Sequence, residues 1–144
     1  MEIKDFIAPL KKMAKSVPAK LGGVACFIIK NGAIISSGVN HNPTGGPMED
    51  EIEITENGEK LRKLITRPEV IHAEVATIQA AKTNQINLTD AIILLTMSPC
   101  INCAKAIAQT GVKELYYLYD WWDKAGLQLL QENDIKIVKI KESK

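Results

Sequence analysis

Near the start of this chain, hydrophobic residues are spaced as in an amphipathic helix. From residue 24 on, they also form short continuous runs, as in buried strands. The opening residues carry apolar side chains three and four positions apart: Ile3, Phe6, Ile7, Leu10, Met13, Ala14 and Val17. This pattern predicts an amphipathic helix over residues 2–16. Two β-branched, apolar runs follow at 24–30 and 33–39, joined by Asn31-Gly32. Because Asn-Gly is the strongest short hairpin signal, these runs predict two antiparallel strands.

After Pro68 the pattern alternates between helix and strand. The pattern predicts helices at 72–83, from 100 to about 111, and at 123–133, and strands at 91–96, 114–119 and 135–140. Strands that alternate with helices predict a sheet with parallel neighbours and helices on both faces. Together with the hairpin, this gives an α/β fold: a three-layer α/β/α sandwich with a mixed five-stranded sheet, formed by one domain over residues 1–144.

Residues 41–68 interrupt the alternation. They contain the turn sequence Gly45-Gly46-Pro47 and a dense acidic stretch from Glu49 to Glu59. We expect a long loop here, with room for a short helix. Long loops inside a compact domain are usually functional.

Composition narrows the class of protein. The chain has 144 residues, of which 46% are hydrophobic and 24% charged, as in ordinary soluble domains. No run is long and apolar enough for a membrane span, and the Lys-containing N-terminus lacks the apolar core of a signal peptide. With three cysteines, we expect reduced thiols and a cytoplasmic protein. A net charge of +1 gives no overall field that would attract nucleic acid, and we expect neither a nucleic-acid nor a membrane partner.

Two short motifs carry the candidate chemistry: His72-Ala73-Glu74 and Pro99-Cys100-Ile101-Asn102-Cys103. One imidazole and two thiolates can bind Zn²⁺ and leave its fourth tetrahedral position open for water, as catalytic zinc sites do. The pair of motifs is the signature of zinc nucleobase deaminases, in which the Glu moves protons and is not a ligand. We therefore predict His72, Cys100 and Cys103 as metal ligands and Glu74 as the catalytic acid and base.

A structural zinc site is the alternative for the two cysteines. Such a closed site needs a second C-x-x-C or a paired histidine, and the remaining candidates are Cys26 and His41. Cys26 lies within a predicted strand and is expected to be a small buried residue. His41 lies in a loop, where solvent exposure and substrate contact are both open.

The chain resembles the deoxycytidylate deaminases of the cytidine deaminase superfamily from about residue 20 to residue 139. Besides the two zinc motifs, the similarity includes residues 24–32 (VACFIIKNG), 38–45 (GVNHNPTG) and 103–107 (CAKAI). The resemblance implies a cytidine deaminase-like fold and the conversion of dCMP to dUMP, the precursor of thymidylate. It also implies that Asn40 contacts the nucleotide, and that the backbones of Ala73 and Ser98 contact the base edge.

Other substrate contacts are less defined by the resemblance. Lys20 lies near a basic position of the family, and Tyr119 or Trp121 near its aromatic segment, so these residues are candidate phosphate contacts. Packing in the core explains Tyr119 and Trp121 at least as well. Val39 and His41 replace a Tyr and a Gly of the nucleotide loop. His41 is also a candidate substrate contact, because it lies in this loop.

Regulation and assembly are further implications of the resemblance. Many family members respond to dCTP and dTTP, and a bound nucleotide effector would bring Mg²⁺. Here Ala80 and Thr83 replace the aromatic residue and the Arg linked to that response, so we expect allosteric control to be absent or altered. The family also implies a homo-oligomer built from dimers, up to a hexamer.

Three competing functions share parts of this pattern. A tRNA adenosine deaminase has the same zinc motifs but needs a basic face, which the balanced charge and the acidic 49–59 stretch do not favour. A deaminase of free cytidine is a nearer rival, although it lacks the loop sequence around Asn40. A non-catalytic binding module would not need Glu74.

Overall fold

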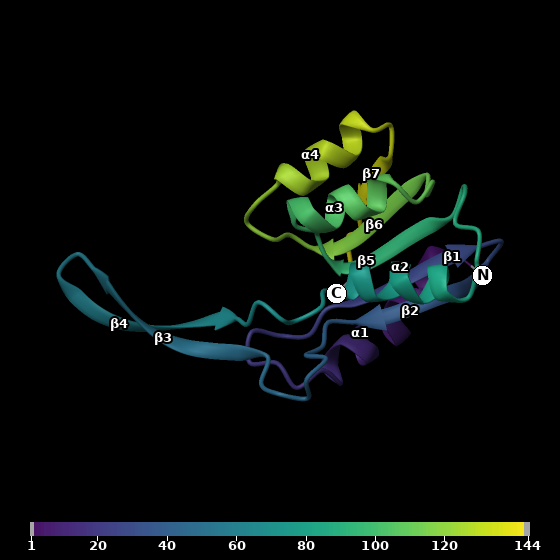
Figure 1. The fold of residues 1–144 in the computed structure, drawn as a ribbon. Coiled ribbons are helices and arrows are strands. Elements are labelled where there is room, and N and C mark those ends of the chain that lie inside the picture. The colour runs from purple at the N-terminus through teal and green to yellow at the C-terminus, as the bar shows by residue number, and fades with distance from the viewer. Residues whose placement is uncertain (1, 143–144) are drawn as a thin grey trace.

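A five-stranded sheet lies between helices on both of its faces in the computed structural model, which describes residues 2–142 (Figure 1). The strands follow the order β2-β1-β5-β6-β7. Their bounds are β1 Ala25–Lys30, β2 Ala33–Val39, β5 Ile92–Met97, β6 Glu114–Tyr119 and β7 Lys136–Lys139. β1 is antiparallel to β2 and β5, whereas β5, β6 and β7 are parallel. The predicted mixed five-stranded sheet is confirmed.

The helices form the two outer layers. They are a short 3₁₀ helix at Ile3–Phe6, α1 Ile7–Lys15, α2 Ala73–Thr83, α3 Ile101–Ala108 and α4 Ala125–Glu132. α1 packs on one face of the sheet, and α2, α3 and α4 cover the other (Figure 1). None of the helices within residues 2–142 is long and apolar enough to span a membrane.

The interior strand β1 shows why the sheet needs both layers. Successive side chains of a strand point to opposite faces. Cys26 and Ile28 lie in the core under α2 to α4, while Phe27 and Ile29 lie in the core under α1, and all four are buried. Cys26 is fully buried, as predicted, and burial raises the pKa of its thiol. A strand that is apolar on both sides is thereby removed from water on both sides.

The expectation of a loop over residues 41–68 is wrong for most of that segment. Two antiparallel strands, β3 (Glu49–Glu56) and β4 (Glu59–Thr66), form a separate two-stranded ribbon. Their turn is Asn57-Gly58, with positive φ at both residues, as a type I′ hairpin turn requires. The density of acidic residues hid the alternation of Ile52 and Ile54 with glutamates. We call residues 49–66 the arm, because the ribbon projects away from the sheet (Figure 1).

The base of the arm is tied to the rest of the chain by charged side chains. The Glu49 carboxylate accepts hydrogen bonds from the backbone N–H groups of Lys20 (3.2 Å) and Leu21 (2.9 Å). Arg67, just after the arm, pairs with Asp50 at 2.7 Å and also with Glu69. These contacts fix the direction in which the arm leaves the body.

Gly126 allows α4 to lie unusually close to the turn that precedes α3. A Cβ atom at this position would lie 2.4 Å from the carbonyl oxygen of Pro99 and 2.9 Å from that of Cys100. Both neighbours are backbone atoms, which cannot rotate away. The absence of a side chain at Gly126 therefore sets the position of the Pro99–Cys100 turn.

We expect Gly126→Ala to destabilise the protein by about 1–3 kcal/mol, the usual cost of overpacking a core. The reason is the clash of the new methyl group with the two carbonyl oxygens. Thermal unfolding should show a Tm lower by roughly 3–10 °C. The variant should also bind Zn²⁺ more weakly, since Cys100 moves with the turn.

Gly46→Ala is the matched control. Its Cβ would meet only the side-chain atoms Thr44 Oγ1 and Asn42 Nδ2, at 3.1 Å and 3.4 Å. We expect this change to stay within about 0.5 kcal/mol of wild type. Equal Tm values for the two variants would show that α4 is free to shift.

Candidate metal centre and catalytic site

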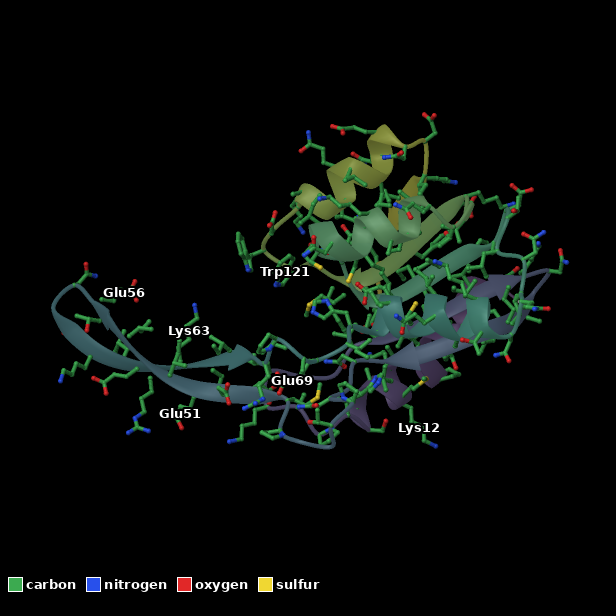
Figure 2. The ribbon with its side chains drawn as sticks, viewed as in Figure 1. Lys12, Glu51, Glu56, Lys63, Glu69 and Trp121 are labelled. Carbon is green, nitrogen blue, oxygen red and sulfur yellow. The ribbon has the colours of Figure 1, made fainter. Side chains whose placement is uncertain are left out.

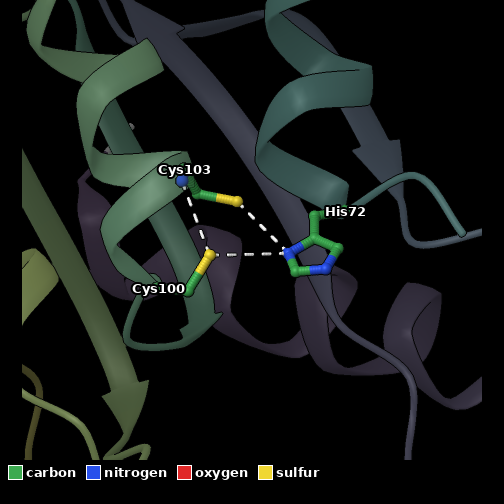
Figure 3. Close-up of side chains that lie close together, drawn as sticks. All are labelled: His72, Cys100 and Cys103. Carbon is green, nitrogen blue, oxygen red and sulfur yellow. Dashed lines mark hydrogen bonds between the residues drawn. The ribbon is translucent and has the colours of Figure 1, made fainter. Parts of the chain in front are cut away.

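Three potential metal ligands converge where α2 and α3 begin (Figure 3). His72 is the N-cap residue of α2, Cys100 is the N-cap of α3, and Cys103 lies in the first turn of α3. The Nδ1 atom of His72 lies 3.7 Å from Cys100 Sγ and 3.3 Å from Cys103 Sγ. All three ligand atoms lie within 4.8 Å of one another.

These spacings fit a tetrahedral zinc ion. With Zn–S bonds of about 2.3 Å and Zn–N bonds of about 2.05 Å, tetrahedral angles place S and N about 3.6 Å apart. The two observed S–N distances lie on either side of that value. One imidazole and two thiolates are also the soft and borderline ligands that zinc prefers. The donor set and its geometry therefore fit zinc with a fourth position left open.

The N-terminus of α3 favours the charged form of the Cys100 sulfur. Cys100 Sγ accepts a hydrogen bond from the backbone N–H of Cys103 at 3.5 Å, in the electropositive first turn of α3. The Cys103 side chain and the His72 ring also stabilise the thiolate, and the pKa of Cys100 falls to about 4. The Cys100 sulfur and burial raise the pKa of Cys103. A bound cation would favour the thiolate form of both sulfurs.

Glu74 lies beside the ligands and is 4% exposed. It is the second residue of α2, two positions beyond His72, so the same helix end presents both side chains. Burial is the main cause that raises the pKa of its carboxyl group above the ordinary value. A carboxyl group with a raised pKa gains and loses a proton more readily near neutral pH, as a proton carrier must.

A cavity of about 360 Å³ opens next to this group. Its volume is in the range of small-molecule sites. The walls combine the candidate metal centre with a mostly apolar surround: Leu21, Gly22, Val24, Asn40, Thr66, Val70, His72, Ala73, Glu74, Met97, Ser98, Cys100 and Trp121. Of the predicted substrate contacts, Asn40, Ala73, Ser98 and Trp121 line this cavity.

Two of these polar residues are held by hydrogen bonds to the chain. Asn40 Oδ1 accepts from the backbone N–H of Val24 at 2.8 Å, which leaves the Nδ2 donor for a ligand. Ser98 Oγ accepts from the backbone N–H of Trp121 at 2.8 Å. Ala73 is the first residue of α2, and the first N–H groups of a helix have no partner within the helix.

The other predicted contacts lie outside the cavity wall. The Lys20 backbone is bound to Glu49, while His41 lines a neighbouring cavity with Asn42 and Gly45. Tyr119 lies in another cavity, and its hydroxyl donates to Glu142 at 3.5 Å. The structure does not bring Lys20, His41 or Tyr119 to the metal centre, and their roles in substrate binding stay predictions.

Sequence reasoning missed most of the apolar wall. Leu21 and Val70 stand in turn-rich segments with no motif, and Thr66 belongs to the arm that was not predicted. Met97 could have been found, because it ends β5 at the edge where α/β folds place their ligands. Trp121, which the sequence analysis named as a candidate contact, lies just beyond the end of the neighbouring parallel strand β6.

Most of the chain is similar in sequence to known zinc-binding deaminases. Residues 2–119 match the family model described as the cytidine and deoxycytidylate deaminase zinc-binding region. Deoxycytidylate deaminase of Enterobacteria phage T2 is 33% identical in an alignment that covers 65% of this chain and 67% of the phage protein. The human deoxycytidylate deaminase is 31% identical over 97 residues, or 67% of this chain and 52% of the human protein. The matched segment thus spans about half to two thirds of these relatives.

Solved structures extend the similarity to nearly the whole chain. The dCMP deaminase of cyanophage S-TIM5, in complex with dCMP and dUMP, superposes with a TM-score of 0.78 at 27% identity. The superposition covers 97% of this chain and 99% of the cyanophage chain. A tRNA:A34 deaminase structure shares the fold, with a TM-score of 0.64 at 18% identity. With its zinc-binding region matched from residue 2 to residue 119, this chain belongs to the cytidine and deoxycytidylate deaminase family.

Proposed function

We propose that this protein hydrolyses the amino group of dCMP, giving dUMP and ammonia. The observation that carries the proposal is the meeting of His72, Cys100 and Cys103 with buried Glu74 at the wall of one cavity. The similarity to the cyanophage dCMP deaminase, over almost the full length of both chains, supports the choice of substrate. A zinc ion held by the three ligands would supply a Lewis acid that acidifies the attacking water.

Glu74 is proposed to move both protons of the reaction. It first takes a proton from the attacking water and delivers it to ring N3, while the water oxygen bonds to C4. It then takes the second proton from the new C4 hydroxyl and delivers it to the amino group. The C4–N bond breaks and ammonia leaves, so one carboxyl group acts as base and as acid in turn. Burial of Glu74 suits this role because its neutral form becomes accessible.

The cavity wall is proposed to orient the cytosine ring. The free N–H of Ala73 can donate to the base oxygen O2, and the backbone carbonyl of Ser98 can accept from the exocyclic amine. Asn40 can donate from Nδ2 to the sugar or phosphate, since its Oδ1 is occupied by Val24. Leu21, Val24, Met97 and Trp121 then exclude water from the ring faces.

Glu74→Gln should abolish turnover while the protein still binds one zinc ion. The amide cannot carry the protons, and loss of a general acid and base costs about 10²–10⁴-fold in rate. Ammonia release from dCMP and zinc content by elemental analysis are the two measurements. Glu132→Gln, the same change at an exposed position of α4, should retain full activity. Turnover by the Glu74 variant near the wild-type rate would contradict the assignment.

Zinc removal should change the reactivity of two of the three thiols. With zinc bound, Cys100 and Cys103 are ligands and Cys26 is fully buried, so a thiol reagent should titrate none of them quickly. After treatment with a chelator, we expect one fast-reacting thiol, Cys100, a slower one, Cys103, which is 2% exposed, and complete loss of activity, all reversed by added Zn²⁺. Unchanged thiol reactivity after chelation would contradict the ligand set.

The substrate proposal is tested by ammonia release from dCMP, dCTP, deoxycytidine, CMP and an adenosine-bearing tRNA stem-loop. We expect dCMP to be the preferred substrate. Repeating the dCMP assay with dCTP, dTTP and Mg²⁺ tests the regulatory expectation, for which Ala80 and Thr83 predict a weak or absent response. Preference for deoxycytidine or the stem-loop would keep the zinc chemistry and overturn the substrate.

A further inference from the structure

A second cavity, of about 320 Å³, lies on the α1 side of the sheet. It is formed where α1 ends and where the parallel strands β5 and β6 end, at the edge at which α/β folds place their ligands. Its volume is at the lower end of the range of small-molecule sites. The proposed reaction takes place in the other cavity and leaves this one without a role.

The polar side chains that line this cavity can all donate hydrogen bonds, and no acidic residue lines it. Lys11 and Lys15 stand four positions apart and therefore lie on the same side of α1. Thr96 is 4% exposed, and its Oγ1 accepts from the backbone N–H of Ala25 at 3.1 Å, which leaves its hydroxyl proton for another acceptor. Tyr119 adds a second hydroxyl. Such a lining is complementary to an anion with several oxygen atoms.

A carboxylate of the chain itself already occupies two of these donors. Lys11 Nζ lies 3.1 Å from one oxygen of Glu142 and 3.2 Å from the other. The Tyr119 hydroxyl donates to the same carboxylate at 3.5 Å. Glu142 and Tyr119 also raise the pKa of the Lys11 ammonium group, which keeps it charged. The cavity thus holds an oxyanion at its side, and its two lysines still exceed the single charge of Glu142.

The Glu142 carboxylate can be displaced at little cost. It is an exposed residue just beyond β7, and ion pairs at a protein surface are weak. A carboxylate has two oxygens and one charge. A phosphate group carries more charge at neutral pH and offers more acceptor oxygens, so it can form charge-assisted hydrogen bonds to both lysines and accept from both hydroxyls. Phosphate therefore fits this donor set better than the side chain that now occupies part of it.

The cavity shares part of its wall with the catalytic cavity. Gly22 and Met97 line both, and Met97 directly precedes Ser98 of the candidate site. A ligand in one cavity is therefore separated from a ligand in the other by these two residues. This position is compatible with two sources of a phosphate group: the nucleotide bound in the catalytic cavity, or a separate molecule.

We propose that this second cavity binds a phosphate group, which displaces the Glu142 carboxylate. The donors are Lys11, Lys15, Thr96 and Tyr119. Glu142 is then an internal competitor, which occupies the site in the free chain and leaves it when phosphate binds.

The test is a titration of the zinc-loaded, full-length chain with inorganic phosphate, followed by ³¹P NMR. Lys11→Gln and Lys15→Gln should each raise the dissociation constant at least fivefold. Glu142→Gln should lower it at least threefold, because the competing carboxylate is gone. Phosphate bound at the zinc ion would show no such pattern of opposite effects.

Two matched controls separate a local contact from a general change of charge. Lys12→Gln removes a lysine of the same helix that lies outside the cavity, and Figure 2 shows its side chain pointing away from the sheet. Glu132→Gln removes an exposed carboxylate of α4. Both should bind phosphate as wild type does, and equal Tm values should show that every variant is folded.

Kinetics then identify the source of the phosphate group. If the nucleotide supplies it, Lys11→Gln should raise the KM of dCMP but not that of deoxycytidine, and inorganic phosphate should compete with dCMP. If a separate molecule supplies it, inorganic phosphate should still bind when dUMP fills the catalytic cavity.

The binding titration needs no turnover, so its result is independent of the proposed reaction. Failure of the dCMP assay would leave the phosphate site in place. Phosphate binding by Lys11→Gln and Lys15→Gln that equals wild type, or no gain in affinity on Glu142→Gln, would overturn the proposal.

Discussion

The structure depends on the close approach of two helix ends. α2 and α3 both begin over the same face of the sheet, and each places a cap residue with a metal-binding side chain at the meeting point. Two electropositive ends would repel each other without an anion between them. Thiolates supply that negative charge, and a bound cation then links the two ends. Metal binding and the packing of α2 on α3 are thus parts of one interaction.

Glycines outside the metal centre allow the helices to pack closely enough for α2 and α3 to meet. Gly126 admits α4 against the backbone of the Pro99–Cys100 turn, and Gly38 admits α2 against β2, where a Cβ would lie 2.7 Å from Thr77 Oγ1. Thr77 in turn donates to the carbonyl of Ala73 at 2.7 Å, within the first turn of α2. The positions of His72 and Cys100 are therefore set in part by small residues that offer no metal-binding side chain.

The sequence predicted the sheet and the ligand set because both depend on strong local signals. Hydrophobic runs such as 91–96 leave few alternatives to a buried strand, and the zinc motifs combine residue types that are rare together. The arm was missed because its apolar residues alternate with glutamates in a stretch whose charge suggested a loop, although Asn57-Gly58 was a usable turn signal. Contacts such as Leu21 with the cavity depend on how distant segments pack, which local patterns do not report.

The anchoring of Glu49 has a mechanical consequence. Its carboxylate holds the backbone of Lys20 and Leu21, and Leu21 is itself part of the cavity wall. Two hydrogen bonds thus connect the base of the arm directly to one wall of the cavity. A change in the mobility of Glu49 should therefore change the mobility of Leu21, and the reverse. A ligand that holds the Leu21 wall in place would therefore also stabilise the two hydrogen bonds to Glu49.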